Sequence, residues 1–330
     1  MGSKRPAVHW RSATLAIALT ITTMLGSVLA LTALEPTVAS DADALSGTVT
    51  LAAYTTPREA YEELITMFQA TDAGAKVQFE TSYSGSGDQS RAVEAGLPAD
   101  IVAPDWWQNE YAGIVHDSVV VLAVRPGNPK GVNGWDDLIR DDVDVITPNP
   151  FTSGGAQWNL LAAYQAQIVS GSSEAEAREY LKELVANTSV MDRSAREALT
   201  TFAAGQGDVL IAYENEAIFA QQAGQPLEYV LPDATILIEN PAAVTLTGDA
   251  PDAARAFIDF LYTPEAQAVF GRHGYRPVLS EVLAQFDYAQ PVDLFTIADL
   301  GGWPEARPRF FDPGSGMVAQ IFAELGRSAA

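Results

Sequence analysis

Residues 149–159 read NPFTSGGAQWN, and this stretch decides the interpretation of the chain. A proline-rich approach leads into Thr-Ser-Gly-Gly, and the apolar spacing of a helix begins directly after it. Gly154 and Gly155 have no side chains to screen their backbone N–H groups, which lack intrahelical partners at a helix start and favour an anion. Ser153 adds a hydroxyl donor, and no lysine follows at the spacing of a nucleotide-binding loop. Taken alone, the stretch predicts either an anion site or an ordinary serine cap on a flexible helix entry.

Similar helix starts with small residues and free donors recur along the chain. Strand-like segments at 47–53, 76–81, 99–103, 118–124 and 143–147 alternate with helical patterns such as 58–70 and 89–95, which predicts an α/β fold with mostly parallel sheets. Ligands of such sheets bind beyond the carboxyl ends of the strands. Small residues, hydroxyls or bare backbone donors stand at four strand-to-helix junctions: 84–87, 152–155, 193–196 and 212–215. Because no catalytic histidine or cysteine lies near them, they favour an anion cradle.

Composition limits the possible functions. The 330 residues are 48% hydrophobic and 18% charged, enough for two domains or for one domain of two lobes. The formal net charge of −23 argues against nucleic acid or an anionic membrane surface as a partner, and it requires that an anion be recognised by local donors. The chain has no cysteine and only three histidines, His9, His116 and His273. We therefore expect no metal site and no cofactor.

Residues 1–40 have the pattern of a targeting segment. Lys4, Arg5 and Arg11 precede an uncharged stretch that runs from Ser12 to Leu34. This predicts a signal peptide, with an uncleaved membrane anchor as the alternative because the apolar stretch is long. In either case we expect the remainder to be exported.

Short motifs extend over most of the chain after this segment. They are SYSGSGDQ at 82–89, GNPKG at 127–131, WDDL at 135–138, ITPNP at 146–150, GDVLI at 207–211, ENE at 214–216, FLYTPEAQ at 260–267, YRP at 275–277, LFTI at 294–297 and GGW at 301–303. In this order and spacing they resemble the periplasmic sulfate-binding protein family, the receptors of sulfate and thiosulfate ABC importers.

The resemblance implies a sulfate site at particular positions. Backbone N–H donors are expected at Ser86, Gly154, Gly155 and Ala195, and a hydroxyl donor at Ser153. Tyr213 falls where well-known members of the family have a tryptophan, and a phenol hydroxyl can also donate. Two residues are expected behind these: Arg196, which would hold the loop, and Thr55, which stands where the family usually has an aspartate.

A site made only of donors suits sulfate, which carries no proton at neutral pH. Hydrogen phosphate would bring a proton with no acceptor to meet it, at a cost of roughly 1–3 kcal/mol. Asp88, close in sequence to Ser86, could spoil this scheme, but we expect it to point to solvent from the first turn of a helix.

The resemblance also implies the architecture and the partners. The expected architecture is a two-lobe periplasmic-binding-protein fold (type II), with a mixed, mostly parallel sheet flanked by helices in each lobe. A two-segment hinge is expected near 118–125 and 236–243. Lobe one is expected at 41–120 and 240–330, and lobe two at 121–239. Lobe one is shortened after Ala103, where a strand-to-helix step of about 15–20 residues is missing. The expected partners are sulfate or thiosulfate and the ABC permease subunits, with the receptor itself a monomer.

Several residues allow other interpretations. Trp106, Trp107, Tyr111, Trp135 and Trp158 are expected in the core rather than stacked on a ligand. The acidic clusters at 136–137 and 141–144 lack the glycine and terminal glutamate of a calcium loop. An exported hydrolase would need a nucleophile that His116 does not have beside it. The open alternatives are therefore a receptor for thiosulfate or molybdate, a relic that no longer binds, and, last, the hydrolase; we expect no enzyme.

Overall fold

The computed structural model describes residues 45–102 and 113–328, which form part of one compact unit spanning 43–330. The expected leader at 1–40, the missing step after Ala103, and Trp106, Trp107 and Tyr111 lie outside the described residues. Among the described residues, no helix combines the length and the apolar character needed to cross a membrane.

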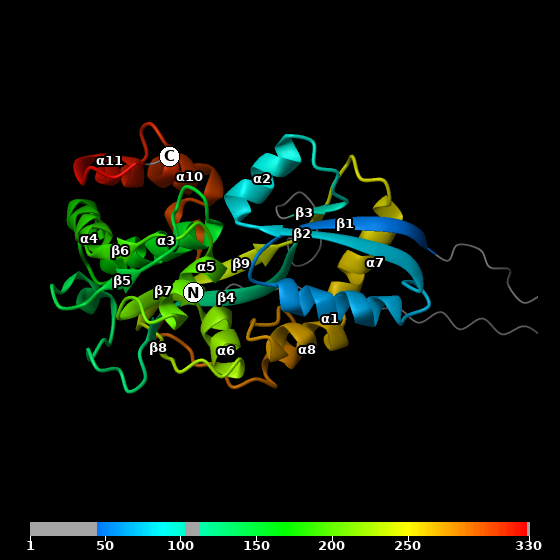
Figure 1. Ribbon diagram of the computed structural model, residues 1–330, viewed down its shortest axis with the longest axis horizontal. Helices are drawn as coiled ribbons and strands as arrows, with labels where there is room; N and C mark the ends of the chain where they lie inside the picture. Colours follow the sequence, from blue (N-terminus) through cyan, green and yellow to red (C-terminus); the bar gives the residue numbers. More distant parts are fainter. Residues whose placement is uncertain (1–44, 103–112, 329–330) are drawn as a thin grey trace, which may run out of the picture. The chain divides into compact units, whose positions relative to one another are not determined.

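The first sheet is built from strands at both ends of the chain. Its order is β10 (Ala243–Val244), β3 (Ile101–Val102), β1 (Ser46–Tyr54) and β2 (Lys76–Ser84). The pairs of β1 with β2 and with β3 are parallel, while β10 joins β3 antiparallel. Helices α1 (Arg58–Gln69), α2 (Ser86–Glu94), α7 (Pro251–Leu261), α8 (Pro264–Arg272) and α9 (Ser280–Leu283) accompany it (Figure 1). Helix α1 buries Ala60, Tyr61, Leu64 and Phe68, the spacing of one helical face.

The second sheet is larger and more mixed. Its order is β11 (Asp293–Phe295), β9 (Ala234–Pro241), β4 (Ile114–Val124), β7 (Val209–Tyr213), β5 (Val145–Ile146) and β6 (Thr188–Val190), with β8 (Glu228–Val230) also paired to β4. The helices with it are α3 (Gly154–Val169), α4 (Glu174–Ala186), α5 (Ala195–Ala203), α6 (Glu214–Gln222), α10 (Trp303–Phe311) and α11 (Met317–Glu324), with 3-10 turns at Trp135–Ile139 and Ile297–Leu300. Strand β4 is antiparallel to β7, β8 and β9. The prediction of a mixed α/β fold is confirmed, but the parallel character is weaker here than the strand-helix alternation indicated.

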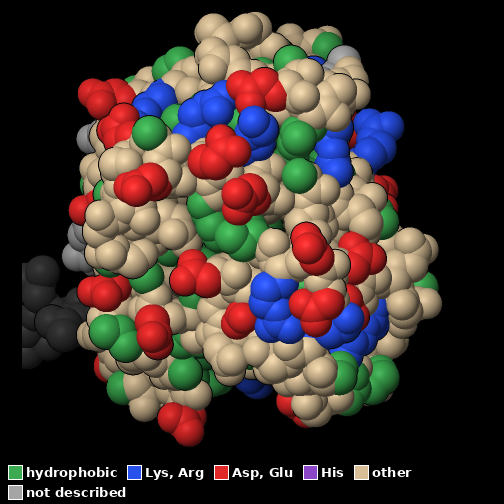
Figure 2. Space-filling view, turned by 90° about the vertical axis from the view of Figure 1, so that its left-hand side faces the viewer, with side chains coloured by type: hydrophobic (Ala, Val, Ile, Leu, Met, Phe, Trp, Pro, Cys, Tyr) green, Lys and Arg blue, Asp and Glu red, His purple; other side chains and the backbone are tan. Residues whose placement is uncertain are grey.

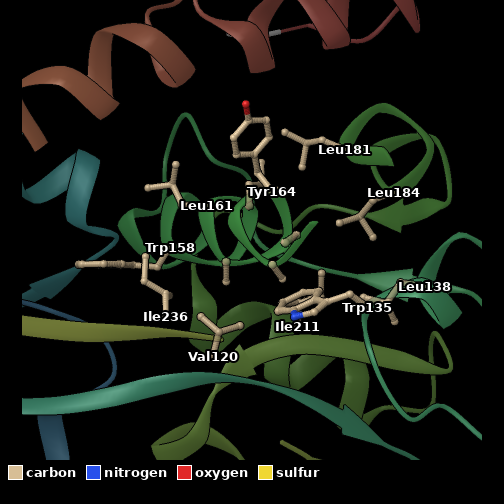
Figure 3. Close-up of a cluster of buried hydrophobic side chains, with 14 of the residues drawn as sticks. Val120, Trp135, Leu138, Trp158, Leu161, Tyr164, Leu181, Leu184, Ile211 and Ile236 are labelled. Atoms are coloured by element: carbon tan, nitrogen blue, oxygen red, sulfur yellow. The ribbon is translucent and has the colours of Figure 1, made fainter. Parts of the chain in front are cut away.

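The cores explain how the C-terminal residues pack. The largest buried cluster joins α3 and α4 to the second sheet, and part of it is shown in Figure 3, with Trp135 and Trp158 inside it as predicted. The same cluster contains Phe310 and Phe322 from α10 and α11. Residues 293–328 therefore pack with the second sheet, which differs from the expectation that all of 240–330 belongs with the first. Apolar side chains of α10 and α11 are buried by this contact, and a boundary drawn along the sequence cannot reveal it.

Candidate anion-binding site

The predicted site residues come together in one small cavity. Its lining is Tyr54, Thr55, Thr56, Gly85, Ser86, Ser153, Gly155, Ser194, Ala195 and Tyr213, and its volume is about 10 Å³. Gly154 lies beside it, since a Cβ added there would be 3.0 Å from the Ser86 hydroxyl oxygen. The strands β1, β2 and β7 all end at this cavity, as expected for the carboxyl edge of α/β sheets. A space of this size is about that of one water molecule, so it excludes a sugar or a peptide.

Backbone donors surround the cavity because three helices begin there. Ser86, Gly154 and Ala195 are the first residues of α2, α3 and α5, and Gly155 is the second residue of α3. Within the described part of the chain, the N–H groups of these four residues donate no hydrogen bond. Unpaired N–H groups at helix starts, together with the helix dipoles, form a binding site for an anion.

The two serines at these helix starts behave differently. The Ser194 hydroxyl caps α5 by accepting a hydrogen bond from the Glu197 N–H at 3.2 Å. Ser153 occupies the same position before α3, but its side chain makes no capping bond and is buried at 4% exposure. The ordinary cap considered from the sequence is therefore wrong for Ser153, whose hydroxyl remains available to the cavity.

Tyr213 contributes its ring from the end of β7. The ring atom Cε1 lies 3.6 Å from a Cβ built on Gly155, and the residue is buried at 4% exposure. Burial first, and then the charge of Glu216, raise the pKa of Tyr213 above its ordinary value. The phenol therefore keeps its proton at neutral pH and can act as a donor.

Arg196 does not line the cavity. Its guanidinium pairs with Glu59 on α1 at 2.8 Å and with Glu216 on α6 at 3.0 Å, and it also donates to the Thr56 carbonyl. Its carbon Cζ lies 4.0 Å from the centre of the Phe219 ring. Two carboxylates thus more than balance the single charge of the arginine. Arg196 connects the loop after β1 to α5 and lies behind the cavity. Thr55 is in the lining itself and not behind it.

Sequence reasoning missed the rim of the cavity. The Gly87 N–H donates to the Thr152 carbonyl at 3.2 Å, and a Cβ on Gly85 or Gly87 would lie 3.0 Å from that same oxygen. As expected, Asp88 does not line the cavity; its side chain is 29% exposed and pairs with Arg91 and, at 2.9 Å, with Arg193. The spacing of glycines around Ser86 was the one available signal, because close backbone approach requires small residues.

The acidic clusters form no metal centre among the described residues. Arg140 pairs with Asp137 at 3.1 Å and with Asp142 at 3.0 Å, and Lys130 pairs with Asp208. Figure 2, which views the side where α4 and α11 lie, shows basic and acidic side chains next to one another on the surface. These ion pairs agree with the prediction that the acids form a solvated surface, since exposed ion pairs are common and weak.

An α/β fold with a small, donor-lined cavity at the carboxyl ends of its strands is the arrangement expected of a protein that binds a small anionic solute. Residues 49–276 match the family model described as bacterial extracellular solute-binding protein. The sulfate-binding protein of Synechococcus elongatus is 41% identical over 296 residues, 81% of this chain and 84% of that protein. The thiosulfate-binding protein of Escherichia coli is 34% identical over 273 residues, 74% of this chain and 80% of that protein. The solved sulfate-binding protein SubI of Mycobacterium tuberculosis H37Rv superposes with a TM-score of 0.77 at 42% identity, covering 80% of this chain and 99% of SubI. The chain belongs to the bacterial extracellular solute-binding protein family.

Proposed function

We propose that this protein captures sulfate outside the cytoplasm and delivers it unchanged to the permease of an ABC importer. The observation that carries the proposal is the cavity itself, where four unpaired backbone N–H groups meet the hydroxyls of Ser153 and Tyr213. A tetrahedral dianion without protons can accept from all of these donors. Sulfate-binding relatives that align with most of the chain support the same ligand.

The site residues act in two groups under this proposal. Ser86, Ser153, Gly154, Gly155, Ala195 and Tyr213 donate to the anion, and Thr55 borders it. Arg196 brings no unbalanced positive charge to the cavity because it is paired with the carboxylates of both Glu59 and Glu216. Affinity then comes from aligned donors rather than from an opposite charge, which fits a chain whose net charge is −23.

Two lobes would close on the ligand. The first lobe comprises the first sheet and its helices, and the second lobe comprises the second sheet together with residues 293–328. Strands β4 and β9 pair with each other and connect the two, so they serve as the hinge. The protein works as a monomer, either free after cleavage of its leader or held at the membrane by it.

Calorimetric titration of the purified protein with sulfate tests the proposal, with phosphate as the control. We expect tight sulfate binding and roughly tenfold to hundredfold weaker phosphate binding, because hydrogen phosphate leaves its proton unmet. Silent titrations with sulfate, thiosulfate and molybdate on a folded sample would instead identify a relic that has lost its ligand.

Thiosulfate is the second candidate, favoured by the thiosulfate-binding relative. One of its terminal atoms is sulfur, which accepts hydrogen bonds weakly, so a cavity of N–H and O–H donors satisfies it less well. Competition between the two anions in one titration ranks them. Hydrolysis is disfavoured because His116 is fully buried and is not among the cavity residues.

A further inference from the structure

The two strands that connect the sheets place two acids opposite each other. In the antiparallel pairing of β4 with β9, His116 faces Asn240 and Asp117 faces Glu239, next to a bulge between Ile114 and His116. Like charges directly opposite in a sheet destabilise the pairing. A carboxylate pair at this position therefore needs either a cation or a proton.

The cation that acts on Asp117, Arg276, is already engaged. Asp117 and Arg276 exchange two backbone hydrogen bonds of 2.8 Å, but the Arg276 guanidinium binds Glu214 on α6 at 2.8 and 3.2 Å and the Ala289 carbonyl at 2.7 Å. Among the described residues, the buried Oδ1 of Asp117 has no hydrogen-bond partner. The charged groups that act on Asp117 are Glu239 from β9 and Arg276 from the segment after α8, with Glu214 behind Arg276.

The neighbouring histidine does not supply the missing charge. His116 is fully buried, with ring centroids of Phe270 and Tyr275 at 4.5 and 4.2 Å. Burial lowers the pKa of His116 to about 3, so the ring stays neutral at physiological pH. Burial, with a further contribution from Glu239 and against the effect of Arg276, raises the pKa of Asp117 to about 7. Burial also raises the pKa of Glu239.

A hydrogen bond to Asn240, the residue after Glu239, connects this part of β9 to the anion cavity. Tyr54 lines the cavity at the end of β1, and its hydroxyl donates to Asn240 Oδ1 at 2.8 Å. Asn240 follows Glu239 in β9 and faces His116 across the strands. A change in how β4 and β9 pair would therefore move a residue of the cavity wall.

We propose that Asp117 and Glu239 form a proton-operated control on the hinge strands, in which a shared proton stabilises the closed arrangement and its loss favours opening and anion release. The connection to sulfate rests on the proposed function, whereas the shared proton does not. Opening would hydrate the pair and lower its affinity for the proton. Proton binding and closure then favour each other by linkage. A pKa difference of one unit between the open and closed forms corresponds to a limit of about tenfold in anion affinity.

The direction with pH follows from the raised pKa. The unfolded aspartate titrates near 3.9, so the folded protein holds an extra proton between about pH 4 and about pH 7. Below this window the protonated pair does not lower the free energy of unfolding. Above pH 7 its destabilising effect is complete. Stability and sulfate affinity should both decline as the pH rises through 7.

Four proteins test this: the native chain, Asp117→Asn, Glu239→Gln and the control Asp141→Asn, which removes an exposed carboxylate. Thermal unfolding without ligand and sulfate titration are measured at about pH 5.5 and about pH 8.5. We expect the native chain and the control to lose several degrees of Tm and about tenfold in affinity at the higher pH. Asp117→Asn should flatten both dependences, and Glu239→Gln should reduce them, because burial still raises the pKa of Asp117 in that variant. An unchanged pH dependence in both pair variants overturns the proposal.

Two readouts keep this result separate from the fate of the proposed function. If no sulfate binds at either pH, the proposed function fails, and the unfolding series still decides whether the pair shares a proton. Carbon NMR of the aspartate carboxyl groups in the native chain gives a check without any variant. A resonance titrating near pH 7 that disappears in Asp117→Asn supports the pair, and an Asp117 signal titrating near 4 overturns it.

Discussion

The Asp88 carboxylate on α2 accepts a hydrogen bond from the Arg193 guanidinium at 2.9 Å, and so joins the helix that follows β2 to the loop that precedes α5. Beside it, the Gly87 N–H donates to the Thr152 carbonyl. These two contacts cross the rim of the cavity between elements of the two sheets. An anion enters or leaves by breaking them, if the lobes open as proposed.

Asp88→Asn should therefore speed release of sulfate. The pair is exposed on the Arg193 side, so we expect the dissociation rate to rise by about twofold to fivefold, with little change in association. Stopped-flow measurement of release into excess competitor provides the rate. Asp252→Asn, which breaks an exposed pair within α7, is the matched control, and an equal rise there would remove the rim from the explanation.

Gly154→Asp should abolish sulfate binding. The added Cβ would lie 3.0 Å from the Ser86 hydroxyl oxygen, and its carboxylate would oppose the anion in a cavity of about 10 Å³. Gly134→Asp is the control, since nothing lies within 4 Å of a Cβ at that position and its backbone is extended. Calorimetry on both variants checks this, with Tm confirming that each is folded. Retained affinity in Gly154→Asp would count heavily against the cradle.

Tyr213→Phe isolates the phenol hydroxyl. Removing one donor to a buried anion costs roughly 1.5–3 kcal/mol, so we expect sulfate affinity to fall by about tenfold to a hundredfold. Because burial raises the Tyr213 pKa, the loss should be the same at pH 6 and pH 8. Unchanged affinity would place the hydroxyl away from the ligand and leave Tyr213 as a wall of the cavity.

Arg196→Gln should destabilise the fold more than it affects the chemistry of the site. Glu216, with a side chain only 2% exposed, would lose its partner, and Glu59 would lose one as well. We expect a loss of about 2–4 kcal/mol in the free energy of unfolding at pH 7. The loss should shrink in acid, where the unpaired carboxylates can protonate. Urea unfolding measures this, and Arg255→Gln on the exposed pair of α7 should change stability by no more than about 0.5 kcal/mol.

Local chemistry made much of the site predictable. Glycine and serine at a strand-to-helix junction dictate bare donors at a helix start, wherever that helix later packs. That rule identified the junctions at 84–87, 152–155 and 193–196, and the family resemblance then named Ser86, Ser153, Gly154, Gly155 and Ala195 within them. The structure gathers these residues in or beside one cavity. Helix α1 was predictable for a different local reason, because its apolar spacing specifies one buried face.

Contacts between distant segments were not predictable in this way. Three kinds of contact join residues far apart in sequence. They are the antiparallel partners of β4, the packing of α10 against α3 and of α11 against α4, and the pairs Asp88–Arg193 and Asp117–Glu239. The sequence by itself determined which groups can donate, because that depends on residue type and helix start. Only the tertiary structure decided which donors share a cavity and which acids face each other, because these depend on strand register and on which apolar faces cover one another.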